Sequence, residues 1–217
     1  MVAAQQVVTV IVPTYNRREM LERAISSVES QTYSETRLIV VDQGSTDGTP
    51  DLLTDRKIRW HLEERLGAGY ARNRGLGESE SEFVMFLDSD DWLVPEAIES
   101  LMEVIQRHSA DCAYGSITNF LLEGTSRLLK QPTTVAPLAS SSLFRRAAFD
   151  RFGMFDNDNH SFPRWVIQSR KKGLRECRTN NQIAFRGIHS RNVSIQPGSH
   201  RYLFDLVRGH RTLSEGG

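Results

Sequence analysis

Three carboxylates within four residues are the side chains of this sequence best suited to do chemistry. Asp88, Asp90 and Asp91 follow the apolar run 83–87. Carboxylates this close together repel one another unless a cation lies between them. Hard divalent cations such as Mg²⁺ and Mn²⁺ prefer oxygen ligands and accept phosphates as further ligands. The alternative is structural, because Asp90 or Asp91 could cap the helix that follows Pro95.

Three further polar segments follow a predicted strand or open a predicted helix. They are Pro13-Thr14-Tyr15-Asn16-Arg17, Asp42-Gln43-Gly44-Ser45-Thr46-Asp47-Gly48-Thr49 and Gly67-Ala68-Gly69-Tyr70-Ala71-Arg72-Asn73-Arg74-Gly75. Open α/β sheets bind their ligands beyond the carboxyl ends of the strands. We therefore expect these segments and the acidic cluster to border one crevice.

The first half of the chain alternates strand and helix patterns. Runs of β-branched residues closed by proline or turn residues predict buried strands, and apolar residues at helical spacing predict helices. The predicted strands are 7–13, 38–42, 58–62 and 83–87, and the predicted helices are 18–30, 50–54, 67–77 and 95–107. This alternation predicts an α/β fold with a Rossmann-like, mostly parallel central sheet flanked by helices.

After about residue 110 the pattern changes to that of a smaller α+β region. The predicted strands are 112–121, 127–131 and 182–187, and the predicted helices are 141–152, 163–172 and 200–208. The last helix carries an apolar stripe made of Tyr202, Leu203, Leu206 and Val207. Such a stripe predicts either packing on the sheet or peripheral association with a membrane surface.

Composition excludes several classes of protein. With 39% hydrophobic residues among 217, the chain is not disordered, and no apolar run approaches the roughly 20 residues of a spanning helix. Two cysteines and a start without a signal-peptide pattern predict a reducing, cytoplasmic location, with the inner face of the membrane as an alternative. A net charge of +0 argues against a nucleic-acid partner.

The charge is unevenly distributed. Asp and Glu outnumber Lys and Arg by 19 to 11 in residues 1–110, and Lys and Arg outnumber Asp and Glu by 16 to 8 in the remainder. This asymmetry predicts that Arg145 and Arg146 face an anionic acceptor.

In this order and spacing, the four segments resemble the family 2 glycosyltransferases of the GT-A fold, over about residues 7–110. The resemblance implies that residues 1–110 form a donor- and metal-binding half. Residues 111–217 would form an acceptor-binding half with a C-terminal helix, both within one GT-A domain. It also implies donor contacts from Pro13, Thr14, Tyr15, Asn16, Asp42, Gln43, Arg72, Asn73, Asp88 and Ser89.

The resemblance also assigns roles within this set. The Thr14 hydroxyl and the Tyr15 ring would contact the base and ribose, and Arg72 a phosphate or the base. Asp90 and His189 would hold the metal, Mn²⁺ or Mg²⁺, with Asp88 and Asp91 as further candidates. His189 belongs to the segment Phe185–Ser194, which resembles the C-terminal motif of the family.

Two departures from the family pattern concern the nucleotide and the catalytic base. The chain has Asp42-Gln43 where members commonly have two aspartates, the second of which accepts the N3–H of uracil. Glutamine also offers a carbonyl acceptor for this N–H.

The second departure concerns the catalytic base. Inverting members usually have acidic residues where this chain has Ser161-Phe162. The nearest groups that could accept a proton are Asp156, Asp158 and His160, although the two aspartates could simply be turn formers.

The sequence thus predicts a metal-dependent, inverting glycosyltransferase that takes a nucleoside-diphosphate sugar, with a UDP-sugar favoured. Its acceptor would be a glycan, a lipid-linked molecule or a small molecule. One alternative is a sugar-nucleotide-binding protein without catalysis, because of Ser161-Phe162. Another is a metal-dependent nucleotidyltransferase, but that class needs a glycine-rich basic loop after the first strand, and Pro13-Thr14-Tyr15-Asn16 does not supply one.

Overall fold

The computed structural model describes residues 6–123, 127–157 and 160–188. Its strands are β1 (Val8–Thr14), β2 (Thr36–Asp42), β3 (Trp60–Leu62), β4 (Phe83–Phe86), β5 (Asp91–Leu93), β6 (Cys112–Glu123), β7 (Arg127–Val135), β8 (Ser142–Arg145) and β9 (Glu176–Ile188). Its helices are α1 (Arg18–Glu29), α2 (Thr49–Asp55), α3 (Ala68–Gly77), α4 (Ala97–Arg107), the 3₁₀ turn η1 (Ala139–Ser141), α5 (Ala147–Phe152) and α6 (Ser161–Lys171).

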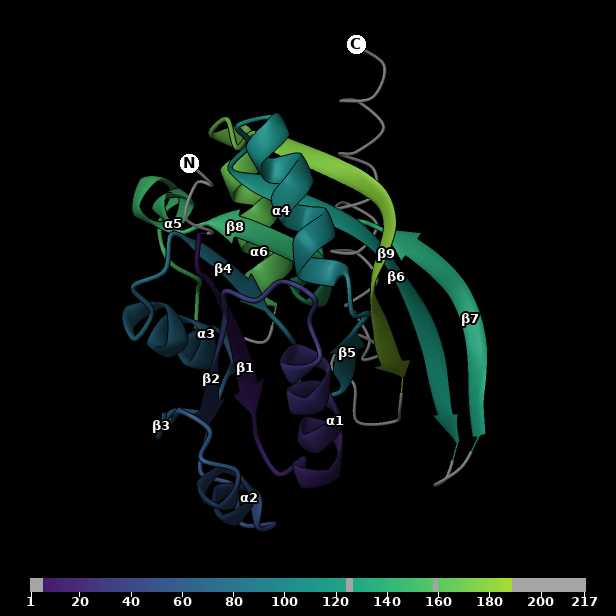
Figure 1. Cartoon of the computed structure of the whole chain (residues 1–217). Coiled ribbons are helices and arrows are strands. Elements are labelled where there is room, and N and C mark those ends of the chain that lie inside the picture. Colours follow the sequence, from purple (N-terminus) through teal and green to yellow (C-terminus); the bar gives the residue numbers. More distant parts are fainter. Residues whose placement is uncertain (1–5, 124–126, 158–159, 189–217) are drawn as a thin grey trace.

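One sheet in the order β3-β2-β1-β4-β8-β6-β9-β5 joins the two halves of the chain, and β7 pairs with β6 (Figure 1). The first four strands of this order are parallel, so β1, β2 and β4 end at one edge, here called the carboxyl edge. Every residue of β1 is buried, as expected of a strand covered by helices on both faces. The remaining strands are mixed, because β8 runs antiparallel to both β4 and β6.

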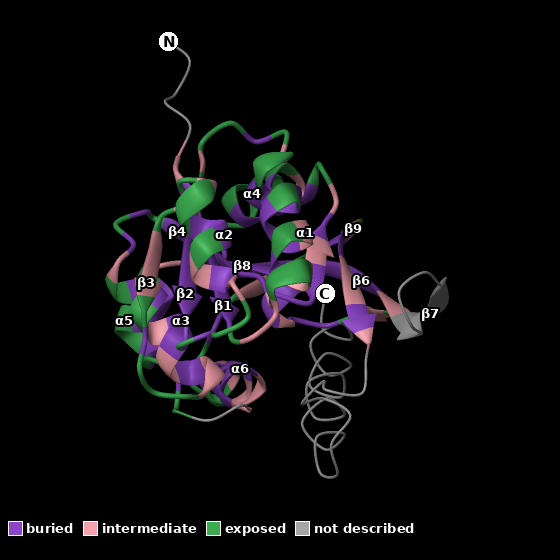
Figure 2. Ribbon diagram, turned by 90° about the horizontal axis from the view of Figure 1, so that it is seen from below, coloured by how far each residue is buried: buried purple, intermediate pink, exposed green. Residues whose placement is uncertain are grey.

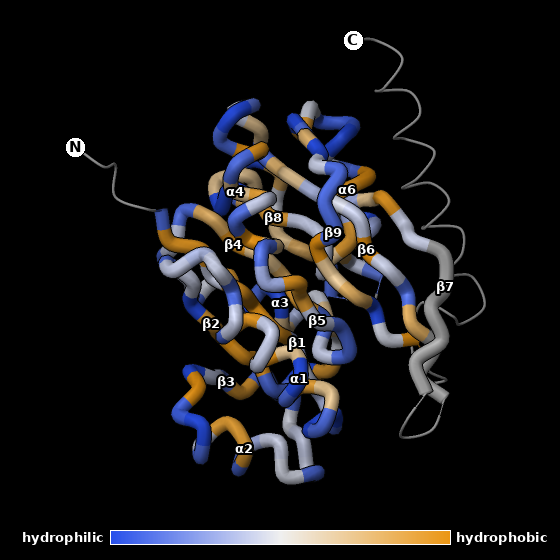
Figure 3. The backbone as a smooth tube through the Cα atoms, turned by 45° about the vertical axis from the view of Figure 1, so that its right-hand side comes forward, coloured by the Kyte–Doolittle hydropathy of each residue, from blue (hydrophilic) through white to orange (hydrophobic). Residues whose placement is uncertain are grey.

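Two apolar cores cover the two faces of the sheet. Helices α1, α2 and α4 contribute to one core, through residues such as Leu21, Leu53 and Ile98. Helices α3, α5 and α6 contribute to the other, which contains the aromatic group Phe86, Phe144, Phe149, Phe155, Phe162 and Trp165. Strands β1 and β4 are accordingly buried while the outer faces of α1, α2 and α4 are exposed (Figure 2). The hydrophobic residues concentrate in the central strands (Figure 3). The fold therefore positions its strand ends rigidly.

The structure confirms the strands and helices expected in the first half and corrects the second. The segment 142–145, expected to be helical, is strand β8, because its backbone fills the gap between β4 and β6; only residues 147–152 form a helix. Strand β9 begins at Glu176, earlier than expected, and the short strand β5 was not anticipated. The expected helix at 200–208 lies outside the described residues.

Within the described part of the chain, no helix has the length and apolar character needed to cross a membrane.

Candidate functional site

The three carboxylates of the acidic cluster converge at the carboxyl edge. Phe86 pairs with Ile11 of β1, so Asp88 lies level with Pro13, two residues further along. One oxygen from each of Asp88, Asp90 and Asp91 lies within 4.8 Å of the others. Asp90 and Asp91 are buried and Asp88 is half-buried. Three converging carboxylates are the kind of donor set that a hard divalent cation prefers, so the residues present fit such an ion.

The capping alternative for these aspartates is wrong. Glu96 occupies the N-cap position of α4 without a side-chain cap, and the Ile98 N–H at the start of this helix donates to Gln31 Oε1 (3.1 Å) rather than to an aspartate. Asp91 is instead the first residue of β5, paired with Arg186 of β9.

Asp91 is held from two sides. Its Oδ2 accepts a hydrogen bond from the Ser140 hydroxyl (2.5 Å), and its Oδ1 accepts one from the Gly187 backbone N–H (3.2 Å). Burial, together with the charge of Asp90, raises the pKa of the Asp91 carboxyl well above its ordinary value, and the Arg186 guanidinium acts in the opposite direction. A cation bound at the cluster would favour the ionised carboxylate.

Arginines neutralise the other two carboxylates in this structure. Arg17 Nη1 lies 3.0 Å from Asp90 Oδ2, and Arg72 Nη2 donates to Asp88 Oδ1 at 2.8 Å. The Arg72 side chain is 5% exposed, and its buried Nε has no hydrogen-bond partner among the described residues. Arg23 donates to the backbone carbonyl of Asp90 (3.3 Å) while its guanidinium lies 3.7 Å from the ring centroid of Trp92. Three guanidinium groups therefore contact the acidic loop, two at its carboxylates and one at a backbone carbonyl.

The loops after β1 and β2 brace each other beside the cluster. Asn16 has φ of 50°, a left-handed conformation that asparagine tolerates. Its backbone N–H donates to Ser45 Oγ (2.8 Å), and its side-chain oxygen accepts from the Thr46 N–H (2.7 Å). Between these loops Thr14 is buried, with no partner for its hydroxyl in the described part of the chain, and Tyr15 is 44% exposed. The Thr14 hydroxyl is thus a buried polar group without a partner among the described residues, whereas the Tyr15 ring is open to solvent.

Asp42 and Gln43 have different surroundings. The two oxygens of Asp42 accept from the Ser45 N–H (3.0 Å) and the Ser45 hydroxyl (2.5 Å), so this buried carboxylate stabilises the turn that follows β2. Gln43 Nε2 donates to the backbone carbonyls of Arg65 and Gly67, the latter at 3.2 Å. No donor to Gln43 Oε1 is found among the described residues, so this oxygen is left as an acceptor.

Asn73 acts on the backbone of Phe155. Its Nδ2 donates to the Phe155 carbonyl (2.9 Å), and its Oδ1 accepts from the Phe155 N–H (3.0 Å). Both ends of the amide are therefore engaged in joining α3 to the segment before α6. Asn73 was predicted to contact the donor; in the structure it positions this segment.

The contact between α3 and this segment leads to a prediction about stability. A Cβ added at Gly69 would lie 1.8 Å from the backbone oxygen of Asp156. We expect Gly69→Ala to destabilise the protein by about 1–3 kcal/mol, the usual cost of overpacking. Gly77→Ala, in the same helix with nothing within 4 Å, should instead stabilise it by up to about 1 kcal/mol. Urea unfolding of both variants measures the two effects; a Gly69→Ala variant as stable as the wild type would contradict the close contact.

The candidates for the catalytic base lie before and at the start of α6. Asp156 is half-exposed and forms an ion pair with Arg164 (3.1 Å). His160 is half-buried at the N-cap position of α6. Asp158 and the metal-ligand candidate His189 lie outside the described residues.

The two residues at the position of the family's acidic pair point into the protein. Ser161 is fully buried, and its hydroxyl accepts from Arg72 Nη1 at 3.4 Å. The Phe162 ring stacks on Phe155 at 5.8 Å between ring centroids. Phe162 therefore belongs to the apolar core rather than to a solvated site.

Sequence reasoning missed Ser140, Glu63 and the pairing of Arg17 with Asp90. Arg17 directly follows the Pro-Thr-Tyr-Asn segment, and this position could have suggested a role; no local pattern marks Ser140. Glu63 is buried after β3, where hydrogen bonds from Arg65 lower the pKa of its carboxyl.

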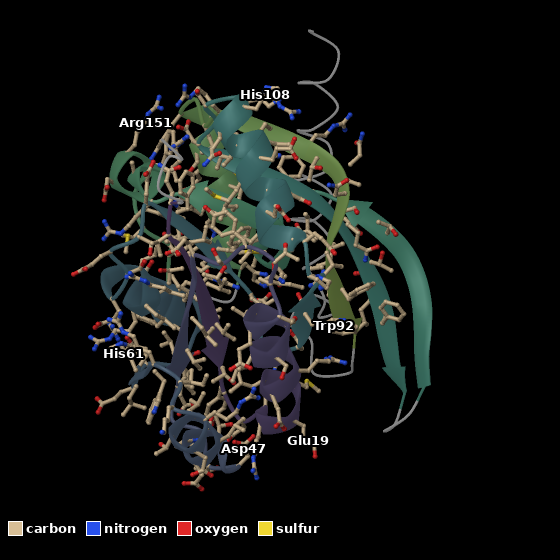
Figure 4. All side chains as sticks on the ribbon, viewed as in Figure 1. Glu19, Asp47, His61, Trp92, His108 and Arg151 are labelled. Carbon is tan, nitrogen blue, oxygen red and sulfur yellow. The ribbon has the colours of Figure 1, made fainter. Side chains whose placement is uncertain are left out.

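Arg145, which was expected with Arg146 to face an anionic acceptor, lies away from the acidic cluster. Arg145 pairs with Phe83, at the opposite end of β4 from the acidic cluster, and its guanidinium binds Glu82 (2.8 Å). In Figure 4 the same end of the molecule carries His108 and Arg151, whereas Trp92, next to Asp91, lies far below them.

The comparisons with known proteins agree with this geometry. The sequence profile of Glycosyl transferase family 2 matches residues 9–165 of the 217. The chain belongs to this family. A relative from Staphylococcus aureus, the poly(ribitol-phosphate) beta-N-acetylglucosaminyltransferase TarP, is 38% identical over 128 residues, which are 55% of this chain and 38% of TarP. The chain spans less than half the length of this family 2 relative and of the other curated relatives it matches.

Solved structures of GT-A type share the fold. S. aureus TarS 1–349 in complex with UDP-GlcNAc has a TM-score of 0.70 at 21% identity, covering 86% of this chain and 60% of the TarS chain. The mannosyltransferase PcManGT from Pyrobaculum calidifontis, solved with GDP-Man and Mn²⁺, has a TM-score of 0.67 at 19% identity, covering 99% of this chain and 66% of its own. The expected GT-A fold of this family 2 chain is therefore confirmed.

Proposed function

We propose that the protein transfers a sugar from a nucleoside-diphosphate sugar to an acceptor hydroxyl, with inversion and with the help of a divalent cation. The observation that carries the proposal is the convergence of Asp88, Asp90 and Asp91 at the carboxyl edge, with Arg17 and Arg72 against them. A carboxylate cluster flanked by guanidinium groups suits a ligand that brings both a cation and a diphosphate. Family membership supports the same reaction class.

In this proposal the donor occupies the half formed by residues 1–110, between the acidic cluster and the loops after β1 and β2. Asp88 and Asp90 hold Mn²⁺ or Mg²⁺, with Asp91 and His189 as further candidates. The cation, when bound, would neutralise charge that develops on the departing nucleoside diphosphate. Arg17 and Arg72 lie within reach of the same group, and each can exchange its carboxylate partner for a phosphate oxygen. Ser89 lies between Asp88 and Asp90 in sequence and is buried.

The nucleoside lies against the loops after β1 and β2. The Thr14 hydroxyl supplies a hydrogen bond and the Tyr15 ring an aromatic face, with Pro13 and Asn16 shaping the wall. Gln43 Oε1 accepts the N3–H of a uracil ring, because the Nε2 of the same amide is engaged with backbone carbonyls. Asp42 supports this wall through its turn. We therefore favour a UDP-sugar as the donor.

The acceptor approaches from the half formed by residues 111–217. His160 is the best-placed described candidate for the base that accepts the acceptor proton, since it directly precedes Ser161, which contacts Arg72. Asp158 and Asp156 are the other candidates, although Asp156 is engaged with Arg164. Among the relatives, TarP is named for an acceptor that is a phosphate polymer. A glycan, a lipid-linked molecule or a small molecule at the inner face of the membrane fits the proposal.

Binding of nucleotides in the presence and absence of Mn²⁺ tests the donor assignment. We expect UDP with Mn²⁺ to raise the melting temperature more than GDP or dTDP with Mn²⁺, or than UDP without metal. At 100 times its Kd a ligand stabilises the native state by about 2.7 kcal/mol. This corresponds to roughly 5–10 °C for a chain of this length. Equal shifts with and without Mn²⁺ would contradict the metal assignment, and a larger shift with GDP would contradict the uracil assignment.

A second candidate function is donor binding without transfer. The observation that favours it is the buried Phe162, which replaces a proton acceptor by a core side chain. Product analysis with a panel of UDP-sugars and acceptor glycans separates the two. Nucleotide binding without any transfer or donor hydrolysis would support the second candidate.

A further inference from the structure

Ser140 lies in the η1 turn between β7 and β8, far from the acidic cluster in sequence, yet contacts both ends of it. Its side chain is buried, with the residue 1% exposed. The Ser140 Oγ accepts a hydrogen bond from the Asp88 backbone N–H (3.1 Å) and donates one to Asp91 Oδ2 (2.5 Å). One hydroxyl thus joins the first and last carboxylate residues of the cluster.

These contacts belong to a connected network. The Asp91 N–H donates to the Asp88 carbonyl (2.9 Å), which closes the acidic loop into a turn. The other oxygen of Asp91 accepts from the Gly187 N–H of β9. Both Asp91 oxygens therefore face protein donors, whereas Asp88 and Asp90 each meet a guanidinium that a ligand can displace. Asp91 is the anchor of the loop, and the Ser140 hydroxyl joins this anchor to the Asp88 backbone.

We propose that Ser140 is a positioning residue that, through Asp91 and the Asp88 backbone, holds the carboxylates of Asp88 and Asp90 in the geometry that binds the divalent cation. This inference rests on the proposed function. Mg²⁺ requires near-ideal octahedral geometry, so a small rotation of the loop removes a ligand. Groups that orient metal ligands without touching the ion typically change metal affinity by about 10- to 100-fold when they are removed.

The chain offers a matched control two residues away. Ser142 is fully buried in β8, and its hydroxyl has no hydrogen-bond partner among the described residues. Ser140→Ala and Ser142→Ala each remove one buried hydroxyl from the same segment. Only the first removes a contact with the acidic loop.

The experiment measures Mn²⁺ binding to the full chain by electron paramagnetic resonance of the free ion, with UDP present, and the melting temperature of each variant. We expect Ser140→Ala to weaken Mn²⁺ binding at least tenfold and Ser142→Ala to change it less than twofold. Because Ser140 acts partly through Asp91, the double variant Ser140→Ala/Asp91→Asn should lose less Mn²⁺ affinity than the sum of the two single losses. A merely structural role would make the two losses add.

The outcomes separate this inference from the proposed function. If the wild type binds Mn²⁺, two results would overturn the role of Ser140 and leave the proposed function standing. One is a Ser140→Ala variant whose Mn²⁺ affinity is within twofold of the wild type, and the other is a Ser142→Ala variant that loses as much Mn²⁺ affinity as Ser140→Ala. Wild-type protein that binds neither Mn²⁺ nor Mg²⁺ would overturn the proposed function and this role with it. If Ser140→Ala does not fold, Ser140→Cys provides the second test, because it keeps a side chain of similar size and replaces the hydroxyl by a thiol, a weak donor and acceptor. The same loss of Mn²⁺ affinity is expected, and affinity within twofold of the wild type would overturn the role of Ser140.

Discussion

Asp90→Asn is expected to weaken Mn²⁺-dependent binding of UDP by about 100-fold or more. Asp90 is buried beside Asp88 and Asp91, and the substitution removes a negative charge from the centre of the cluster without changing its shape. Because the loss of a group that merely orients a metal ligand already costs about 10- to 100-fold, the loss of the ligand itself should cost at least as much. Calorimetric titration of UDP in the presence of Mn²⁺ measures the effect.

Asp150→Asn is the matched control, since Asp150 is exposed on α5. It should leave UDP binding unchanged. The melting temperature of Asp90→Asn without ligand is needed as well, because the substitution also removes the counter-charge of Arg17. An Asp90→Asn variant that is folded and binds UDP with Mn²⁺ as the wild type does would show that the metal assignment is wrong.

His160→Ala is expected to slow sugar transfer by about 10²- to 10⁴-fold, the usual contribution of a general base. Donor binding should stay within about twofold, because His160 lies at the start of α6, in the half of the chain that the proposal assigns to the acceptor. A loss of turnover without a loss of donor affinity separates proton transfer from binding. Single-turnover kinetics with saturating UDP-sugar measures the chemical step.

His108→Ala provides the control, since His108 is exposed at the end of α4 and far from the site in Figure 4. Asp158→Asn and Asp156→Asn complete the set of candidate bases. If none of the three substitutions slows transfer tenfold, the proton is accepted by another group. If Asp158→Asn alone does so, the base is Asp158 and His160 has a structural role.

Local pattern was sufficient for the first half of the fold and insufficient for the second. β-branched runs such as residues 8–13 are buried on both faces of a parallel sheet, so their sequence reports their environment directly. Ser142-Leu143-Phe144-Arg145 is different, because it is too short for a periodic signal and forms a strand only through pairing with β4 and β6. Non-local pairing overrode local helical preference there.

The candidate site shows the same division. The acidic cluster and the polar segments after β1 and β2 were predicted, because parallel strands bring their carboxyl ends to one edge. The partners of these residues were not. Asn73 proved to bind the Phe155 backbone, and the Arg145–Glu82 pair proved to lie at the opposite end of β4. Such partners come from segments distant in sequence, whose relative placement no local pattern encodes.

The sequence by itself determined the family resemblance, the order of elements to residue 110 and the carboxylates that can hold a cation, because these depend on residue type and short-range spacing. Only the tertiary structure showed that Arg17 and Arg72 neutralise two of those carboxylates and that Ser140 ties Asp88 to Asp91. It also showed that Phe162 is a core side chain. The contacts of Ser140 and Phe162 follow from the packing of η1 and α6 against the first half of the sheet. Side chains tens of residues apart acquire their roles only when that packing buries them together.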